Sequence, residues 1–345
     1  MLPSGVYNET YSQDIAVIRT RTHMVLATAS FLAAFALPHL AGDALTSWLT
    51  MVMITIIAVL GLVVTTGYCG QISIGHAAFM AVGAFTYAHL TRHGVPWIAA
   101  IIGGGITASI VGTLFGLSCL KVKDLYLALT TLAAQFIVPW MIIEYFGGAR
   151  GVVPAEATIG GMVLLDQNHF YYLALIVLLA TTYFVFNLGR SKAGRAFKAI
   201  RYQDSAAESM GIDIRRYKLL SFTIGCFIAG IAGSLMVIFM GKADIEYFTV
   251  KDSIWLLAML LLGGSGSFVG AYFGVFFILG ISEGSHRIVS FVAASFPDYQ
   301  VALSSLPHFL MALIIIVLVL YEPRGWYHRW LTFKASYRVW PWAHW

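Results

Sequence analysis

The chain has 345 residues, of which 59% are hydrophobic and only 11% are charged, and its formal net charge is +5. Its mean hydropathy is +0.81. Soluble domains carry about 25% charged residues, so this composition excludes a soluble globular protein. Apolar runs of about 20 residues recur along the chain, which predicts an all-α, polytopic membrane helical bundle. The excess of Lys and Arg is typical of cytoplasmic loops and does not point to a nucleic-acid partner.

The apolar runs divide the chain into nine segments. They lie near residues 24–41, 46–67, 72–91, 96–119, 125–146, 169–188, 218–240, 253–282 and 301–321. The first also has the layout of a secretory signal, but Pro38-His39-Leu40 is a poor cleavage site, so a retained span is preferred. The eighth is too long for one upright span and is interrupted by glycines and serines, so we interpret it as two pieces with a short first limb. We therefore expect about ten membrane segments, with discontinuous helices, in a single transmembrane domain of residues 1–345.

The basic residues indicate which side of the membrane each loop faces. With the N-terminus inside, residues 1–23, 187–218 and 322–345 are cytoplasmic, and sixteen of the 21 Lys and Arg residues lie on the inner face. A single pass for the eighth segment would move the C-terminal basic cluster outside, so the charge count also favours two pieces. The external stretches are acidic or neutral and offer a surface for a soluble partner. The aromatic-rich tail predicts contact with membrane lipid.

A first candidate site lies between the second and third segments. It contains Gly70, Gln71, Ser73, Gly75 and His76. Irregular polar backbone at membrane depth is tolerated only where protein buries it or water lines it, and broken helices of this kind build substrate sites in transporters. A translocation pathway is one interpretation, and a tight turn near the inner face with simple glycine packing is the other. For His76 alone, a hydrogen-bonded packing role is preferred to proton transfer.

A second candidate is the glycine-rich interruption of the eighth segment. Gly266 and Gly270 belong to a four-residue glycine repeat that leaves one helix face bare, and Gly263 and Gly264 precede it. The stretch superficially resembles a phosphate-binding loop, but it lacks the Lys-Ser/Thr ending. We therefore expect close helix packing together with a hinge or gate.

Ionisable groups are nearly absent from the segment interiors, apart from His76 and His308. A carrier driven by protons or sodium usually needs a buried charged group, and an ion channel usually shows a charged ring or a carbonyl filter. No paired carboxylates, metal-ligand cluster or nucleophile–base set is present, and Cys69, Cys119 and Cys226 have no metal-like spacing. We therefore expect no enzyme activity, metal or cofactor in this chain, and an energy source elsewhere.

The strongly polar stretch 187–218 is the remaining candidate. Ser205-x-x-Glu208 matches a capping box and Gly211 fits a helix stop, which predicts a short helix from Ala206 to Met210 between basic flanks. Its exposed Met210 would insert into a groove of a partner protein. A loop that binds lipid headgroups is the alternative.

Several stretches resemble, in order, the Liv-type branched-chain amino acid ABC transporter permeases, and the M-type subunit more than the H-type. The resemblance runs from about Gly61 to Gly325. The motifs that carry it are GQISIGHAAF from Gly70, GRAFKAIR from Gly194, AAESMGI from Ala206, YKL from Tyr217, AGIAG from Ala229, the stretch from Ser253 to Gly266, and the weaker GGARG from Gly147 and EPRG from Glu322. Each motif is loose, but the ordered set is specific. Cys69 and the aromatic tail depart from the family pattern.

The resemblance implies an inner-membrane subunit that pairs with a second permease, two cytoplasmic ATPases and a periplasmic substrate-binding protein. It implies a branched-chain or other hydrophobic amino acid as substrate, with urea, short amides and aromatic acids carried by related systems. The residues it assigns to ATPase coupling are Arg195, Arg201, Ser205, Ala206, Ala207, Glu208, Met210 and Gly211. A passive channel for a small neutral solute such as urea, or an ion-coupled carrier, is the alternative.

Overall fold

The computed structural model describes most of the chain. The described residues are 34–39, 42–117, 124–146, 151–155, 158–159, 162–163, 167–295, 309, 312–313, 316–317, 320 and 325–339. The predictions for residues 1–23, for Cys119 and for most of the first and last apolar segments lie outside these ranges.

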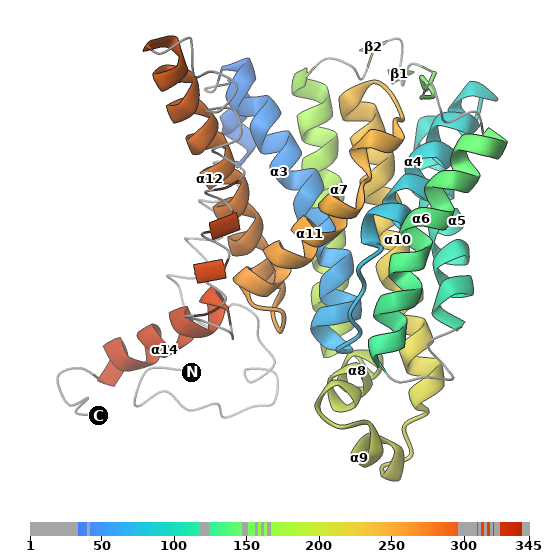
Figure 1. Cartoon of the computed structure of the whole chain (residues 1–345), viewed down its shortest axis with the longest axis vertical. Coiled ribbons are helices and arrows are strands. Elements are labelled where there is room, and N and C mark those ends of the chain that lie inside the picture. The colour runs from blue at the N-terminus through green and yellow to red at the C-terminus, as the bar shows by residue number, and fades with distance from the viewer. Residues whose placement is uncertain are drawn as a thin grey trace.

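The described part of the chain is almost entirely helical (Figure 1). Its elements are α3 (Asp43–Leu62), the π-helical turn η1 (Val63–Tyr68), α4 (His76–Arg92), α5 (Trp97–Gly116), α6 (Asp124–Phe146), β1 (Thr158–Ile159), β2 (Met162–Val163), α7 (Gln167–Arg190), α8 (Lys192–Tyr202), α9 (Asp204–Ser209), α10 (Ile214–Met240), the 3₁₀ turn η4 (Ile245–Tyr247), α11 (Val250–Gly263), α12 (Phe268–Ser295) and α14 (Trp326–Val339). β1 and β2 form one short antiparallel pair. The predicted all-α class is confirmed.

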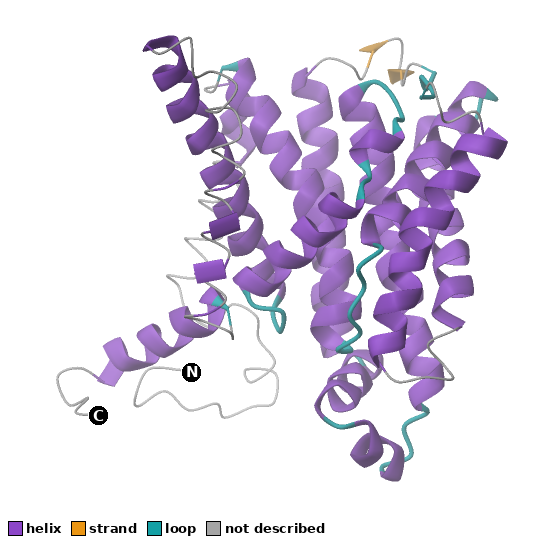
Figure 2. Cartoon of the chain, viewed as in Figure 1, coloured by secondary structure: helices purple, strands orange, loops and turns teal. Residues whose placement is uncertain are grey.

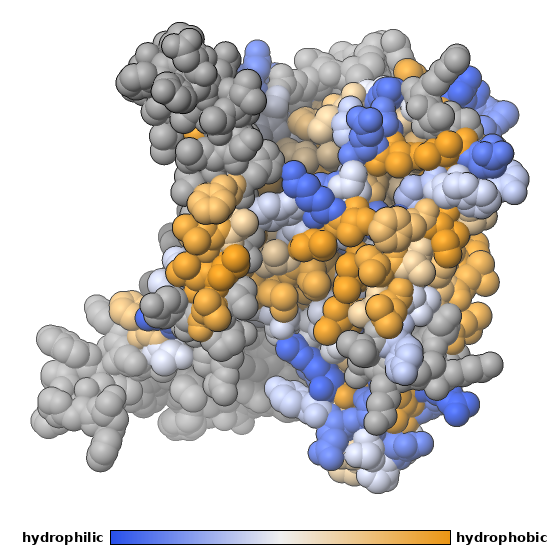
Figure 3. All heavy atoms as spheres, in the orientation of Figure 1, coloured by the Kyte–Doolittle hydropathy of each residue, from blue (hydrophilic) through white to orange (hydrophobic). Residues whose placement is uncertain are grey.

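Six helical stretches in the described residues are long and apolar enough to cross a membrane. They are Asp43–Tyr68, Trp97–Gly116, Tyr126–Phe146, Asn168–Arg190, Ile214–Met240 and Phe268–Ser285. Hydrophobic atoms gather across the middle of the molecule, while hydrophilic atoms gather at its two ends (Figure 3). α4 has 17 residues, which is the lower limit for a membrane-spanning helix, and α11 has 14, which is too short to span the bilayer. The chain is a multi-pass membrane protein, as its composition predicts.

The centre of the bundle is built from α3, α10, α4 and α5, which approach one another through glycines. A Cβ atom added at Gly233 of α10 would lie 1.9 Å from the carbonyl oxygen of Met80 in α4. A Cβ atom at Gly83 would lie 2.3 Å from the carbonyl oxygen of Gly230. Such contacts leave no room for a side chain, so the glycines allow helix backbones to touch in the absence of a hydrophobic driving force.

Two of the membrane segments are discontinuous, as predicted. Residues 69–75 form an extended stretch between η1 and α4, and α4 starts part-way along the neighbouring helices (Figure 2). The alternative interpretation, a tight turn, describes only the start of this connection: the chain reverses at Cys69 and Gly70, and residues 71–75 then extend before α4 begins. The eighth segment is broken at Gly264, so that the oblique α11 and the upright α12 meet at one end of the bundle (Figure 1). α8 and α9 lie at this same end, which we call the α9 end.

The polar stretch 187–218 is more ordered than a loop. It contains the end of α7, all of α8 and α9, and the start of α10. α8 was not predicted from the sequence. It is strongly amphipathic, and it buries Ala196, Phe197 and Ile200 against the bundle while Lys192 and Arg195 are exposed.

Candidate translocation site

The extended stretch 69–75 is held in place by its own backbone and by threonines of η1. Gly70 has φ +80°, a left-handed conformation that residues with a Cβ rarely adopt. The backbone N–H of Gln71 donates to the carbonyl of Thr65 at 3.1 Å, and the hydroxyl of Thr66 donates to the carbonyl of Gln71 at 2.8 Å. These bonds satisfy polar groups that would otherwise be exposed at membrane depth.

Gln71 and His76 are buried and already hydrogen-bonded. The Ser221 hydroxyl of α10 donates to Gln71 Oε1 at 3.1 Å. The Nε2 atom of His76 lies 3.0 Å from the carbonyl oxygen of Ala58 in α3, and because a carbonyl only accepts, Nε2 carries the hydrogen. His76 therefore fills the packing role that the sequence favoured. In this conformation both side chains support the break in the helix through these hydrogen bonds.

The start of α4 is capped by two side chains that the sequence did not single out. The backbone N–H of Ala77 donates to Ser253 Oγ of α11 at 2.8 Å, and that of Ala78 donates to Gln135 Oε1 of α6 at 2.9 Å. The Ser253 hydroxyl also donates to Gln135 Oε1 at 2.8 Å, and Gln135 Nε2 donates to the carbonyl of Phe248 at 2.7 Å. Gln135 therefore joins α6, α4 and α11, and the N–H groups of Ala77 and Ala78 are not free for a ligand.

Ser73 differs from its neighbours in the break. Its side chain is 1% exposed. Among the described residues, its hydroxyl is the one buried side-chain polar atom that has no hydrogen-bond partner. A buried hydroxyl without a partner is costly, so Ser73 is the residue of the break with unused hydrogen-bonding capacity. The N–H of its neighbour Ile74 donates to Thr131 Oγ1 at 3.0 Å, which fixes the extended stretch 69–75 beside α6.

The glycines of the second break pack α11 tightly on α12. A Cβ atom at Gly263 would lie 1.8 Å from the carbonyl oxygen of Gly270, and one at Gly270 would lie 2.6 Å from the carbonyl oxygens of Gly263 and Gly264. Gly264 has φ +108°, which reverses the chain direction. Gly266 has no such backbone contact, since a Cβ atom added there would meet only the Arg201 guanidinium, at 3.6 Å. The predicted close packing is present, while the predicted gating role stays a prediction.

Arg201, at the end of α8, contacts both breaks. Its guanidinium donates to the carbonyl of Gly67, at the end of η1, and to Ser265 Oγ in the α11–α12 turn at 3.0 Å. Its aliphatic part lies against Gly70, where an added Cβ would be 3.1 Å from Arg201 Cγ. The two breaks also touch directly, since a Cβ at Gly67 would lie 2.3 Å from the carbonyl oxygen of Ser265. We call Arg201 with Gly67 and Ser265 the Arg201 bridge.

Lys198 makes a second connection between α8 and η1. Its ammonium donates to the carbonyl of Gly189 at 3.0 Å and lies 5.3 Å from the centre of the Tyr68 ring. A cation above an aromatic face is attracted to it. α8 therefore holds the end of η1 through two side chains.

α9 projects from the α9 end of the bundle and differs in detail from the predicted helix. It runs from Asp204 to Ser209, and its N-cap residue is Gln203. The Ser205–Glu208 capping box is therefore wrong, because Ser205 already lies inside the helix. The Gly211 stop is confirmed: Gly211 has φ +79°, and its N–H donates to the carbonyl of Glu208 at 2.9 Å.

The exposed surface around α9 includes most of the residues that were predicted to couple to an ATPase. Met210 is 84% exposed, and Arg195, Ala206 and Glu208 are exposed as well. Ala207 is buried and anchors α9. A 2.6 Å ion pair between Lys218 of α10 and Asp204 fixes the start of α9. No group of three His, Cys, Asp or Glu residues in the described part of the chain is placed to hold a metal ion.

Comparison with known proteins identifies the family of this bundle. The model of the family described as "Branched-chain amino acid transport system / permease component" matches residues 44–320. The chain belongs to this permease family. The matched region contains both breaks, the Arg201 bridge and α9.

Individual relatives within the permease family support the same assignment. The chain is 33% identical over 247 residues to the high-affinity branched-chain amino acid transport system permease protein LivM of Escherichia coli (strain K12), which covers 63% of this chain and 58% of the relative. It is 26% identical to a probable LivM of Methanocaldococcus jannaschii, over 66% of this chain and 67% of the relative. It is 25% identical to the LivH permease of Escherichia coli, over 65% of this chain and 79% of the relative.

The identity to LivM exceeds the identity to LivH, which agrees with the predicted M-type resemblance. The chain matches only about 58% of the length of the LivM relatives from Escherichia coli and Salmonella typhimurium. No solved structure matches the chain.

Proposed function

We propose that this chain is a permease subunit of an ABC importer that carries a small hydrophobic or branched-chain amino acid across the inner membrane. A second permease subunit, two cytoplasmic ATP-binding subunits and a periplasmic binding protein complete the transporter. The M-type similarity and the permease family support this proposal. ATP hydrolysis takes place on the partner chains.

The observation that carries the proposal is the Arg201 bridge. An importer driven by an external ATPase needs a physical connection from the docking surface to the transport pathway, and coupling of this kind requires contiguous elements with two arrangements. α8 and α9 form the exposed surface, and Arg201 of α8 contacts the ends of η1 and α11 at the two breaks. Displacement of α8 would therefore move both discontinuous segments together.

The α9 end faces the cytoplasm in this proposal, as the charge distribution of the loops requires. Both termini are then cytoplasmic, and the β1–β2 pair is external. Gly70, Gln71, Ser73, Gly75 and His76 form or support the pathway, and the unpartnered Ser73 hydroxyl is the group that a passing polar solute would meet.

ATPase docking on α9 predicts the effect of a bulky residue at Gly211. No atom lies within 4 Å of a Cβ at this position, so Gly211→Trp strains the left-handed turn without a clash in the core. The exposed docking surface changes, while membrane insertion does not. We expect ATP hydrolysis to continue and amino-acid uptake to fall about tenfold, which corresponds to about 1.4 kcal/mol of lost coupling.

Gly94 provides a matched control at the opposite end of the bundle. It has φ +82° and also has no atom within 4 Å of an added Cβ. Gly94→Trp should leave uptake per ATP unchanged. Normal uptake by Gly211→Trp would contradict the docking assignment. Uptake that persists without ATP would instead favour the passive channel, and dependence on a proton or sodium gradient would favour the ion-coupled carrier.

A further inference from the structure

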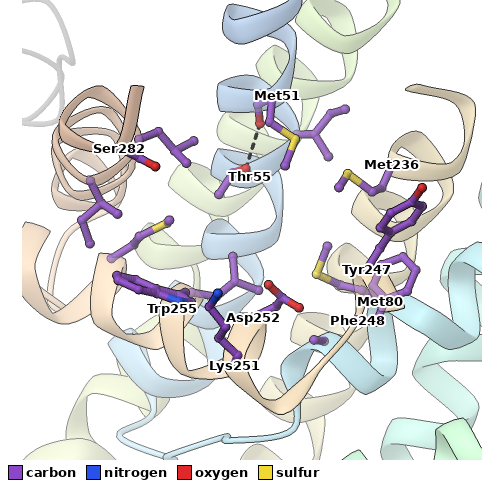
Figure 4. A pocket seen from close by; sticks show the side chains of 16 residues that line it. Met51, Thr55, Met80, Met236, Tyr247, Phe248, Lys251, Asp252, Trp255 and Ser282 are labelled. Carbon is purple, nitrogen blue, oxygen red and sulfur yellow. Dashed lines mark hydrogen bonds between the residues drawn. The ribbon is translucent and has the colours of Figure 1, made fainter. Parts of the chain in front are cut away.

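A cavity of about 250 Å³ lies beside the first turn of α11, between α3, α4, α10 and α12 (Figure 4). Its wall is mostly apolar and includes four methionines: Met51, Met80, Met236 and Met259. Pockets for drug-sized ligands measure about 300–1,000 Å³, so this cavity suits a smaller ligand, of amino-acid size. Methionine side chains are flexible and adapt to hydrophobic groups of different shapes. The wall therefore favours an uncharged aliphatic group.

Two adjacent residues of opposite charge, Lys251 and Asp252, also line the cavity. Their end groups lie on the α11 side of the cavity (Figure 4). Asp252 Oδ2 accepts hydrogen bonds from the N–H of Thr249 at 2.9 Å and from its hydroxyl at 2.6 Å, which fixes the carboxylate at the start of α11. Among the described residues, neither Lys251 nor Asp252 has an ion-pair partner.

The other charged residues of the preceding turn do not compete for this role. Lys242 and Asp244 pair with each other at 2.8 Å, and this hydrogen bond lowers the pKa of Asp244. Glu246 is exposed and does not line the cavity. Lys251 and Asp252 are therefore the two charged side chains that a ligand in the cavity would meet.

The cavity also adjoins the first break. Ala77, in the first turn of α4, forms part of its wall, and the N–H of Ala77 is held by Ser253, the residue that follows Asp252. A ligand that binds Asp252 therefore sits on the turn of α11 that caps α4. The Ser253 hydroxyl in turn donates to Gln135 Oε1 of α6, which also accepts from the N–H of Ala78.

We propose that this cavity binds the zwitterion of a small hydrophobic amino acid. The ammonium group binds the carboxylate of Asp252, the carboxylate binds the ammonium of Lys251, and the aliphatic side chain lies among the methionines. The assignment rests on the proposed function, because it names the substrate class and the place where the permease holds it.

Protection of a cysteine in the cavity tests the proposal without depending on transport. Ser282 of α12 lines the cavity, so the near-isosteric Ser282→Cys places a thiol in it, and Ser209→Cys places one on exposed α9. The full-length chain is purified in detergent with any subunit that stays bound, and the rate of thiol alkylation is measured against the unsubstituted parent. L-leucine should slow modification of Ser282→Cys and leave Ser209→Cys unchanged.

Two analogues with a single charge test the role of each group. 4-Methylpentanoate lacks the ammonium group of leucine, and 3-methylbutylamine lacks its carboxylate, so neither should protect at the leucine concentration that does. Asp252→Asn should raise the concentration of leucine needed for half-protection about tenfold, as expected when the ammonium group loses a charged acceptor and keeps only a neutral one. Glu246→Gln is the control outside the cavity and should leave this concentration unchanged.

Equal protection by either analogue, or an unchanged leucine requirement in Asp252→Asn, would overturn the zwitterion assignment. Absence of leucine protection in a complex that still takes up leucine would overturn the cavity site and leave the proposed function standing. Failure of the unsubstituted complex to take up any hydrophobic amino acid would overturn the proposed function itself, which is a separate measurement.

Discussion

Replacement of Arg201 by methionine is the sharpest perturbation of the coupling that we propose. The substitution keeps most of the aliphatic packing against Gly70 and removes both hydrogen bonds of the Arg201 bridge, to the Gly67 carbonyl and to Ser265 Oγ. α8 then remains folded through its buried apolar face, but it loses its polar contacts with the ends of η1 and α11. The variant therefore separates the coupling role of Arg201 from the folding of α8.

The size of the expected effect follows from the strength of the two hydrogen bonds that Arg201→Met removes. Hydrogen bonds to charged groups contribute about 1.5–3 kcal/mol each when buried, and exposed ionic contacts contribute about 0.2–1 kcal/mol. Arg201 is largely exposed, so the two bonds together are worth about 2 kcal/mol rather than the sum of two buried ones. A shift of about 2 kcal/mol changes an equilibrium between two arrangements by about 30-fold.

The assay is uptake of labelled amino acid and ATP hydrolysis in the same reconstituted complex. We expect Arg201→Met to hydrolyse ATP while the amount of solute carried per ATP falls by about an order of magnitude or more. Arg201→Lys should recover only part of the loss, because one ammonium group cannot reproduce a guanidinium that contacts two acceptors. Lys192→Met is the matched control, since Lys192 is an exposed cation at the other end of the same helix.

Unchanged transport per ATP in Arg201→Met would refute the reasoning, because the bridge would then carry no coupling. Equal losses in Arg201→Met and Lys192→Met would also refute it, since they would trace the effect to the charge of α8 and not to the contacts with the two breaks.

Two further predictions concern the stability of the bundle, measured as thermal unfolding in detergent. Gly233→Ala should lower the melting temperature, because the new Cβ would lie 1.9 Å from the Met80 carbonyl oxygen. Gly280→Ala, in open space on α12, should leave the melting temperature unchanged or raise it, since alanine is the better helix former by about 1 kcal/mol. Gln135→Leu should cost about 2–3 kcal/mol, because it removes the acceptor of the Ser253 hydroxyl and the donor to the Phe248 carbonyl, both of which are buried. A melting temperature equal to that of the parent in Gln135→Leu would show that these groups find other partners.

Much of the architecture follows from the sequence because the bilayer imposes simple rules. The lengths of the apolar runs predict the membrane spans. The distribution of Lys and Arg residues favours two pieces over a single pass for the eighth segment. The GGSGS interruption that begins at Gly263 coincides with the second break, between α11 and α12. The polar residues between the second and third segments locate the first, since such residues have no place on a lipid-exposed helix.

The contacts within the site could not be predicted in the same way. Gln135 is a single amide in an apolar run, and nothing in its spacing indicates that it faces the start of α4, 57 residues away along the chain. Arg201 was noticed for its charge, but its two acceptors are 134 and 64 residues distant. α8 was not predicted because charged residues dominate the sequence of this stretch. Its apolar face is evident only in the structure, where Phe197 and Ile200 pack against the bundle.

ATP-driven uptake is the central claim, and reconstitution tests it most directly. The chain is inserted into proteoliposomes with its partner subunits so that the α9 end and the ATPases share one compartment, and the binding protein and labelled L-leucine are supplied on the opposite side. Our account predicts accumulation of leucine against its gradient when ATP is present with the ATPases, and none with ADP or with a non-hydrolysable ATP analogue. Equal leucine movement with and without ATP, or accumulation that follows an imposed ion gradient, would contradict it.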